Sequence, residues 1–381
     1  MINELEFSNN PFHKDKRIKY RLKDIFDDNW ENFLRDNPNL YIRKVVHKEV
    51  NRMIKCKTIK LGYSLYECPN CNKIKFVFHT CKSRFCPSCG NSSIRKRTNK
   101  ILSKCYKCDH RHIVFTISDY LWDIFRHDRK LIDLLFQAVS TTILSWFKDK
   151  YKKEKYTPGI IAVLHTYGRD MKWNPHIHTI VTEGAMGNFN VFKKFDFISY
   201  DALRKRFQKL LLDLLEKKLG KDKFRMLKNK IYLKSDKGFY VYAKPSPNST
   251  TKNKIEYAIR YTGKPVIAES RIIDYDGTFV TFWYQRHEDN KLIVEKVHVY
   301  DFIKRLIIHI PDKNFKTIRY YGIYSKKHKF HDKMFMLMKS HFSYISSHLT
   351  KWRMMILNDF GVDPINCTFC GNQMIWQYRV C

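Results

Sequence analysis

The centre of the chain reads Gly159-Ile-Ile-Ala-Val-Leu-His-Thr-Tyr167, then Gly168-Arg-Asp-Met-Lys-Trp-Asn-Pro175, then His176-Ile-His-Thr-Ile-Val-Thr182. The first and third runs are rich in apolar and β-branched residues, which is typical of buried strands. The run between them begins with Gly, ends with Pro and has the length of a hairpin loop. The stretch therefore predicts two antiparallel neighbouring strands.

The segments on either side of this hairpin alternate between strand and helix patterns. His112–Ser118 and Phe239–Ala243 are expected as further strands, and residues 265–300 as strands joined by turns at Asp276-Gly277 and Asp289-Asn290. Because hairpins outnumber crossover connections, we expect an α+β fold built on an antiparallel sheet. Helices are expected over about Asp128–Lys150, Leu203–Leu215, Asn253–Thr262 and much of Asp301–Phe360, with earlier helical signals in residues 17–55.

The distribution of the cysteines suggests how the 381 residues divide into domains. Eight of the eleven cysteines lie between Cys56 and Cys108, none lies between Cys108 and Cys367, and three close the chain. We therefore expect a helical, metal-stabilised module over 1–109, a cysteine-free central domain over 110–300, and a helical region with a Cys knuckle over 301–381.

The charge indicates the partner. Lys and Arg number 72 against 37 Asp and Glu, a formal net charge of +35, which favours binding to a polyanion, most often nucleic acid. A lysine-rich genome would enrich Lys without explaining such an excess over acids, and an anionic membrane surface is the competing partner. A hydrophobic share of 44% excludes a disordered chain.

The sequence also indicates a compartment. No run approaches 18 apolar residues, and acidic residues stand near the N-terminus where a signal peptide requires basic ones. We therefore expect a cytoplasmic, nucleoid-associated protein without membrane contact. Disulfides are rare in the cytoplasm, so spaced cysteine pairs there point to metal.

Two Cys-x-x-Cys knuckles carry the strongest metal signal, Cys68-Pro-Asn-Cys71 and Cys86-Pro-Ser-Cys89. Four thiolates from knuckles at this spacing can surround one Zn²⁺, and such a closed site stabilises a fold rather than catalysing a reaction. Cys81 is a fifth thiol and His79 a sixth donor, and either could replace a knuckle cysteine. Nearby basic residues make this module a candidate DNA-binding surface: Arg84, Arg95, Lys96 and Arg97.

Two further cysteine pairs leave alternatives open. Cys105 and Cys108 precede His110 and His112 and could hold a second ion, although a predicted strand begins at His112. Cys367-Thr-Phe-Cys370 forms half of a zinc ribbon. Its missing ligands could be Cys381 and a distant donor such as Cys56.

His176 and His178 form a possible metal-binding pair on a predicted strand. Residues i and i+2 of a strand point to the same face, so both imidazoles can reach one divalent ion while Ile177 faces the core. Two histidines and one other donor would leave positions for water and phosphate oxygens. The alternative is a pair of surface histidines, which the motif alone does not exclude.

Tyr257 and Tyr261 lie on one face of a predicted helix, four residues apart. They could be ordinary core aromatics. A phenol with a pKa near 10 is also a nucleophile whose phosphodiester product can be reversed. Three basic residues nearby could hold a DNA backbone: Lys254, Arg260 and Lys264.

Together these features resemble the two-tyrosine transposases of rolling-circle insertion sequences, within the HUH (His-hydrophobe-His) endonuclease superfamily. The resemblance covers about residues 40–330 in a series of ordered blocks. They are Cys81-Lys-Ser-Arg-Phe-Cys-Pro-Ser-Cys89, His112-Ile-Val-Phe-Thr-Ile117, His165-Thr-Tyr-Gly168, Pro175-His-Ile-His178, Tyr257–Tyr261, Pro265-Val-Ile-Ala268, Ser270-Arg271, His309-Ile-Pro311 and Arg319-Tyr-Tyr-Gly322.

The resemblance implies a central HUH nuclease domain with an antiparallel sheet and helices on one side. It also implies that single-stranded DNA is cleaved and rejoined through 5′-phosphotyrosine intermediates. His176 and His178 would hold Mg²⁺ or Mn²⁺, and Tyr257 and Tyr261 would be the nucleophiles. His165 is the first candidate for the third metal ligand, with Asp170 and Glu183 as alternatives. Many relatives have His where Asn174 stands.

Three functions follow from these features. The first is a transposase whose zinc module binds DNA near the ends of a mobile element. The second keeps the chemistry in a rolling-circle replication initiator of a plasmid or phage. The third is a zinc-dependent nucleic-acid-binding protein with an inactive nuclease, which would bind with a steep salt dependence but form no covalent product.

Overall fold

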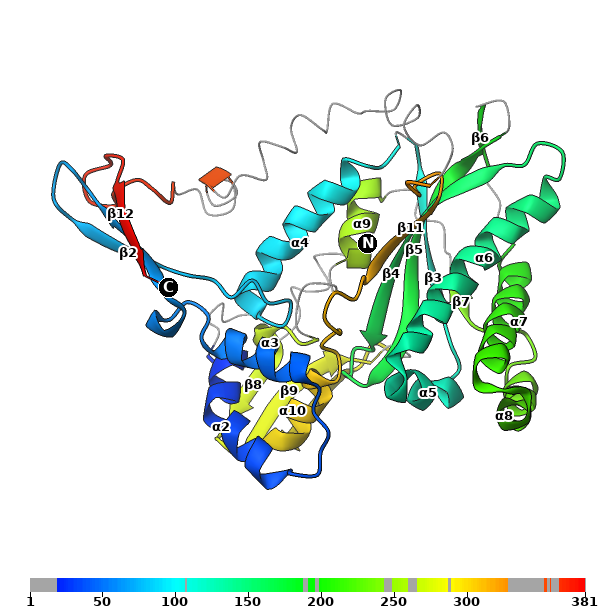
Figure 1. Ribbon diagram of the computed structural model, residues 1–381, viewed down its shortest axis with the longest axis horizontal. Helices are drawn as coiled ribbons and strands as arrows, with labels where there is room; N and C mark the ends of the chain where they lie inside the picture. Colours follow the sequence, from blue (N-terminus) through cyan, green and yellow to red (C-terminus); the bar gives the residue numbers. More distant parts are fainter. Residues whose placement is uncertain are drawn as a thin grey trace. The chain divides into compact units, whose positions relative to one another are not determined.

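The computed structural model describes residues 19–106, 108–187, 191–195, 199–242, 249–259, 266–286, 289–327, 353–354, 357 and 363–380. These residues form two compact units (Figure 1). One unit is drawn from residues 1–103, 263–313 and 341–381, and the other from 104–262 and 314–340. No helix in the described part of the chain is long and apolar enough to cross a membrane.

The unit that contains residues 104–262 is built on a six-stranded sheet. Its strand order is β11-β4-β5-β3-β7, with β6 added beside β5, and every neighbouring pair is antiparallel. The predicted central hairpin is thus present as β4 and β5, and the α+β expectation is confirmed. The strands are β3 (His110–Thr116), β4 (Thr157–Tyr167), β5 (Trp173–Met186), β6 (Phe192–Lys194), β7 (Val241–Tyr242) and β11 (Ile318–Gly322).

Helices cover both faces of this sheet. Phe115 of β3 packs on Phe207 of α7 at a ring-centroid distance of 5.1 Å, and α6 lies beside α7 (Figure 1). His112, on the opposite face of β3 because side chains alternate along a strand, contacts Tyr257 of α9. The expectation of helices on one side is therefore corrected. The helices are α5 (Trp122–His127), α6 (Ile132–Lys150), α7 (Tyr200–Leu219), α8 (Lys221–Lys234) and α9 (Thr251–Ile259), with 3-10 turns at Asp119–Leu121 and Arg129–Leu131.

A buried polar cluster joins the start of β3 to the segment after β11. The hydroxyl of Tyr324 lies 2.6 Å from Nε2 of His110, and the hydroxyl of Thr251 lies 3.2 Å from Nδ1 of the same ring. Burial lowers the pKa of His110 to about 4. The ring is therefore neutral in the folded protein over the whole neutral range.

His110 should make the unit less stable in acid. In the unfolded chain a histidine has a pKa near 6.5, so between about pH 6.5 and 4 only the unfolded state takes up the proton. Lowering the pH from 7 to 5 should thus remove about 2 kcal/mol of stability through this residue. The free energy of unfolding, measured with urea at pH 7 and pH 5 for wild type and for His110→Gln, tests this prediction. Equal pH slopes for the two proteins would contradict the assignment.

The other unit contains a small sheet packed against helices. α2 (Leu22–Asp36), α3 (Lys44–Ile54) and α10 (Val299–Ile307) lie beside the antiparallel strands β8 (Ile272–Tyr275), β9 (Phe279–Gln285) and β10 (Leu292–His298). Ile25, Phe26, Trp30 and Phe33 recur at helical spacing on one face of α2 and are buried. The packing includes ring contacts such as Phe33 with Tyr300 and Phe282 with Phe302.

The same unit contains α4 (Pro87–Leu102) and a three-stranded ribbon of order β12-β1-β2 (Figure 1). The ribbon pairs β1 (Tyr63–Glu67) with β2 (Ile74–Phe78) and with β12 (Ile375–Val380), which ends the described chain. Short 3-10 turns occur at Ile59–Leu61 and Glu269–Arg271.

The C-terminal region differs from the helical one expected for 301–381. Its described part contributes α10, a strand of the central sheet (β11) and a strand of the ribbon (β12). Residues 328–352 of the expected helical stretch lie outside the described residues. The expected boundary near 109 lies close to the division at residue 103. Residues 266–286 and 289–300, however, group with the N-terminal helices rather than with the central sheet, because their strands pack on α2 and α10.

Candidate active site and cysteine clusters

Three histidines meet on one face of the central sheet. His176 and His178 lie two residues apart on β5 and so share one face of the strand. The register pairs His176 with His165 of β4. One nitrogen from each of the three rings lies within 4.8 Å of the others. His165 and His178 are 4% and 6% exposed, while His176 is partly accessible, so an approaching substrate meets the cluster at His176. The expectation that His165 joins the pair agrees with this arrangement.

Hydrogen bonds orient all three rings. Nδ1 of His176 donates to the Asn174 carbonyl at 2.7 Å, and Nε2 of His165 donates to the Ala258 carbonyl at 2.7 Å. Nδ1 of His178 lies 2.8 Å from Nε2 of His112. Any metal would therefore be bound through Nε2 of His176, Nε2 of His178 and Nδ1 of His165.

Burial keeps these rings neutral. It lowers the pKa of His176 to about 4 and lowers the pKa values of His165 and His178 well below the usual range, with smaller effects from neighbouring histidines on the last two. A neutral imidazole has a lone pair that can bind a metal. The three residues therefore have the protonation state and spacing that a divalent ion requires.

Tyr257 stands beside this cluster on α9. Its ring centroid is 6.0 Å from that of His178 and 5.3 Å from that of His112, and the side chain is 42% exposed. The neighbouring residue, Ala258, supplies the carbonyl that orients His165. The position of α9 and the orientation of a candidate ligand are thus linked. Tyr261, Arg260 and Lys264 lie outside the described residues.

The other candidates for the third ligand are engaged elsewhere. Glu183 pairs with Arg111 at 3.0 Å, and Asp170 accepts from the backbone N–H of Lys172 in the turn between β4 and β5. Asn174 lies on the same face of β5 as His176. Its Oδ1 atom is buried, and no described group donates to it.

His112 belongs to the site although the sequence suggested a different partner for it. It was considered as a possible ligand with Cys105 and Cys108, but it contacts His178. Among the described residues, Cys105 and Cys108 join no cluster of metal-ligand type. The sequence feature that could have indicated His112 is another His-x-His motif, His110 to His112, which lies on strand β3 beside β5.

One cysteine cluster combines Cys81, Cys86 and Cys89 with Cys56. The sulfur of Cys89 lies 3.6 Å from that of Cys56 and 3.6 Å from that of Cys81. Hydrogen bonds from the other three thiols lower the pKa of Cys56. The structure thus differs from the predicted grouping, in which both knuckles shared one ion, because Cys56, just after α3, and Cys81 take the two places assigned to Cys68 and Cys71.

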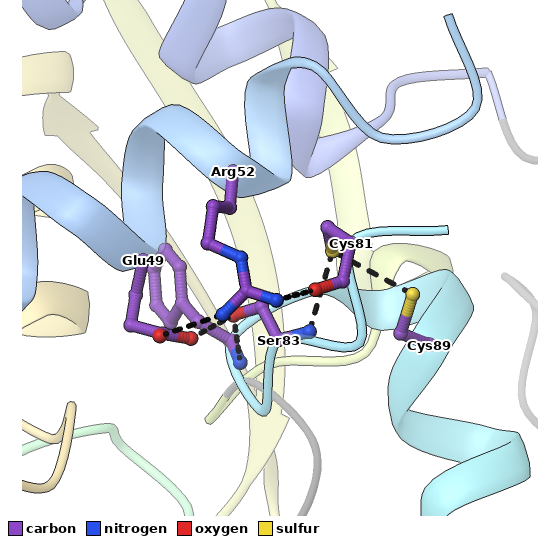
Figure 2. Close-up of polar contacts among 6 residues, drawn as sticks. Glu49, Arg52, Cys81, Ser83 and Cys89 are labelled. Atoms are coloured by element: carbon purple, nitrogen blue, oxygen red, sulfur yellow. Dashed lines mark hydrogen bonds and ion pairs between the residues drawn. The ribbon is translucent and has the colours of Figure 1, made fainter. Parts of the chain in front are cut away.

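A polar clamp fixes the loop that carries Cys81 (Figure 2). Arg52 of α3 donates to the Cys81 carbonyl and pairs with Glu49, which in turn accepts from the Ser83 hydroxyl. The backbone N–H of Ser83 donates to the Cys81 sulfur at 3.4 Å. These contacts orient a sulfur ligand through its neighbours, as in metal sites generally.

Cys68 and Cys71 form a second cluster with Cys367 and Cys370. The C-terminal knuckle is thus completed by the first N-terminal knuckle and not by Cys56, as had been considered. Cys381 lies outside the described residues. His79, the other considered donor, lies 3.1 Å from the Ser64 hydroxyl and joins neither cluster.

The basic residues expected to bind DNA fall into two groups. Lys96 is exposed on α4, while Arg84 and Arg97 are partly buried, and burial with the charge of Arg84 lowers the pKa of Arg97 to about 10. Lys254 donates to the His110 carbonyl at 2.7 Å, near the histidine cluster. Arg95 lies in α4, but its side chain is not among those described.

Comparisons with known proteins agree with this arrangement. Residues 25–117 match the family described as "Transposase zinc-binding domain", and residues 159–331 match the family described as "Putative transposase". The first range contains all four cysteines of the cluster around Cys56, and the second contains the histidine cluster and Tyr257. No solved structure matches the chain.

Two curated proteins are similar over most of their length. The transposase for insertion sequence element IS801 of Pseudomonas savastanoi pv. phaseolicola is 30% identical over 376 residues, covering 94% of this chain and 90% of that protein. The putative transposase y4qJ of Sinorhizobium fredii is 26% identical over 293 residues, covering 72% and 73%. The similarity therefore extends across both compact units, and the chain belongs to the family of insertion-sequence transposases that includes the IS801 transposase.

Proposed function

We propose that this transposase cleaves and rejoins single-stranded DNA through 5′-phosphotyrosine links, with Tyr257 as one nucleophile. The observation that carries the proposal is the half-exposed phenol of Tyr257 beside a cluster of three neutral histidines. The single-stranded ends of a mobile element would be the substrate. Tyr261, four residues further along the sequence, would be the second nucleophile.

The proposed reaction is the attack of a tyrosine oxygen on a phosphodiester that the site holds in position. The Tyr257 hydroxyl gives up its proton as its oxygen attacks the phosphorus, the bond to the 3′ oxygen breaks, and the leaving 3′ oxygen takes up a proton, so that no net proton is gained or lost. A divalent ion held by His165, His176 and His178 would polarise the scissile phosphate. Three imidazoles suit Mn²⁺ better than Mg²⁺, which prefers oxygen ligands. Attack by the 3′-hydroxyl of another strand on the phosphotyrosine reverses the step and joins DNA.

The zinc-binding module would serve as a DNA-binding platform. A structural Zn²⁺ held by Cys56, Cys81, Cys86 and Cys89 would fix the N-terminus of α4. Arg84 and Arg97 lie close enough that the charge of Arg84 lowers the pKa of Arg97, so they bring two positive charges to this module. With Arg95 and Lys96 on the same helix, this surface would hold the phosphate backbone.

A covalent-adduct assay tests the proposal. Labelled single-stranded oligonucleotides covering the DNA that flanks the gene are incubated with the protein and Mn²⁺ or Mg²⁺, and adducts are separated under denaturing conditions. Wild type should form an adduct that depends on the metal. Tyr257→Phe removes one nucleophilic oxygen and should lose the adduct at one joint, and the double change with Tyr261→Phe should lose all adducts.

Tyr242→Phe is the matched control, because Tyr242 is 43% exposed against 42% for Tyr257 but lies on β7. It should leave adduct formation unchanged. An adduct that survives in the Tyr257→Phe, Tyr261→Phe double variant would overturn the assignment of the nucleophiles. Salt-dependent DNA binding without any covalent product would overturn the cleavage proposal itself.

His112 should act as a positioning residue for His178. When His178 binds an ion through Nε2, its Nδ1 carries the proton and donates to Nε2 of His112, 2.8 Å away, which would hold the lone pair of His178 Nε2 toward the ion. His112→Phe should weaken Mn²⁺ binding about 10–100-fold. Titration of free Mn²⁺ by electron paramagnetic resonance measures this without DNA. His112→Gln retains an acceptor oxygen and should recover part of the affinity, whereas equal losses in both variants would indicate a packing role.

A further inference from the structure

The second cysteine cluster consists of two turns with the same backbone geometry. In the first, the N–H of Asn72 donates to the Cys68 carbonyl at 2.9 Å, and the N–H of Cys68 donates to the Lys73 carbonyl at 2.9 Å. The second turn repeats this pattern. The N–H of Gly371 donates to the Cys367 carbonyl at 3.0 Å, and the N–H of Cys367 donates to the Asn372 carbonyl at 2.8 Å.

Both turns also place a left-handed residue directly after the second cysteine. Asn72 has φ 54° and Gly371 has φ 75°. Asn and Gly are the residues that tolerate this conformation most readily. Backbone N–H groups that follow contact the sulfurs: that of Asn372 contacts the Cys370 sulfur, and those of Phe369 and Cys370 contact the Cys367 sulfur.

The four sulfurs are spaced as ligands of one ion. The sulfur of Cys68 lies 3.4 Å from that of Cys370, and the sulfur of Cys71 lies 3.7 Å from that of Cys367. Four sulfurs at 2.3 Å from a tetrahedral Zn²⁺ are about 3.8 Å apart. A disulfide would need about 2.05 Å. The spacing therefore fits metal coordination and excludes covalent pairing in this arrangement.

Packing alone gives the ribbon little stability. All six residues of β12 are exposed, and β2 alternates between exposed and half-exposed positions. The core beside the cluster consists of Cys68, Cys367 and Met374, with Tyr66, Cys71 and Cys370 partly buried against it. A three-stranded sheet without a buried apolar face is marginal in water, and small folds of this kind usually require a metal. β12 is nevertheless paired with β1 along its length.

We propose that Cys68, Cys71, Cys367 and Cys370 bind a second structural Zn²⁺, which holds the C-terminal strand against the N-terminal hairpin. The matched zinc-binding family covers residues 25–117 and so contains only half of these ligands. The site joins residues almost 300 positions apart, since Cys68 and Cys370 are separated by 302. The proposal is independent of the cleavage chemistry.

Metal analysis of the full-length protein under reducing conditions tests the site. Wild type should contain two Zn²⁺ per chain, and the Cys367→Ser, Cys370→Ser double variant should contain one. Cys105→Ser, Cys108→Ser is the matched control, because neither cysteine joins a cluster among the described residues, and it should retain both ions. One Zn²⁺ in wild type, two in the double variant, or iron in place of zinc would each overturn the proposal.

A second measurement separates coordination from folding. Hydrogen exchange of the wild-type chain should show protected β12 amides when zinc is bound, and chelation should remove that protection. Cys370 is only half-buried, so Cys370→His can supply a nitrogen ligand in its place and should retain the second Zn²⁺, whereas Cys370→Ser should not. If both variants retain the second Zn²⁺, the sulfur of Cys370 is not a ligand. If chelation leaves the exchange of the β12 amides unchanged, the metal does not hold this strand in place.

Discussion

His178→Ala is expected to abolish detectable Mn²⁺ binding at the histidine cluster and to lower DNA cleavage about a thousandfold. His178 is the member of the cluster that contacts all the others: its ring centroid is 3.8 Å from that of His165, 5.1 Å from that of His176 and 5.0 Å from that of His112. Loss of the metal removes several kcal/mol of charge stabilisation at the phosphate, and about 4 kcal/mol corresponds to a thousandfold in rate. Isothermal titration with Mn²⁺ and single-turnover cleavage measure the two effects.

The folded state of this variant must be checked, because His178 is buried. Truncation of a buried ring leaves a cavity that costs stability, so circular dichroism and urea unfolding should accompany the assays. His127→Ala is the matched control, since His127 is exposed on α5, and it should change neither binding nor cleavage. A folded His178→Ala protein that binds Mn²⁺ as tightly as wild type would show that the metal, if any, lies elsewhere.

The sequence predicted well the features that depend on neighbouring residues. The hairpin of β4 and β5 follows from two apolar runs around a Gly- and Pro-containing loop, and the shared face of His176 and His178 follows from the period of a strand. The family was recognised from motif order and is confirmed by the relatives. That Tyr257 reaches the histidines follows from neither pattern, because it depends on how α9 packs on the sheet.

The cysteine clusters show where such reasoning fails. A Cys-x-x-Cys turn supplies two ligands, and its spacing does not state which second pair completes the site. Cys68-x-x-Cys71 and Cys86-x-x-Cys89 are close in sequence but belong to separate clusters, because β1 and β2 turn the first knuckle toward β12. The sequence also does not predict β12, whose pairing with β1 brings Cys367 and Cys370 beside Cys68 and Cys71, because the C-terminal region is expected to be helical.

Cys86→Ser, Cys89→Ser is expected to unfold the segment from α3 to α4. These two cysteines start α4 and, with Cys56 and Cys81, form a cluster whose members come from three separate segments of the chain. A structural Zn²⁺ in such a site contributes apparent binding energies of about 10–16 kcal/mol, which is as large as the whole stability of a typical domain. The remaining polar clamp of Glu49, Arg52 and Ser83 is too small to replace it.

Hydrogen exchange with mass spectrometry distinguishes local from global unfolding in this variant. The amides of α4 should lose protection, and one Zn²⁺ per chain should be lost, whereas β4 and β5, which belong to the other compact unit, should remain protected. DNA binding should fall with the loss of α4, since Lys96 and Arg97 would no longer be held on one helix. Cys108→Ser serves as the control for thiol loss alone. If α4 stays protected without zinc, the packing of the buried residues Phe85 and Ile101 is sufficient to stabilise this module. The metal would then affect the surface of the module and not its fold.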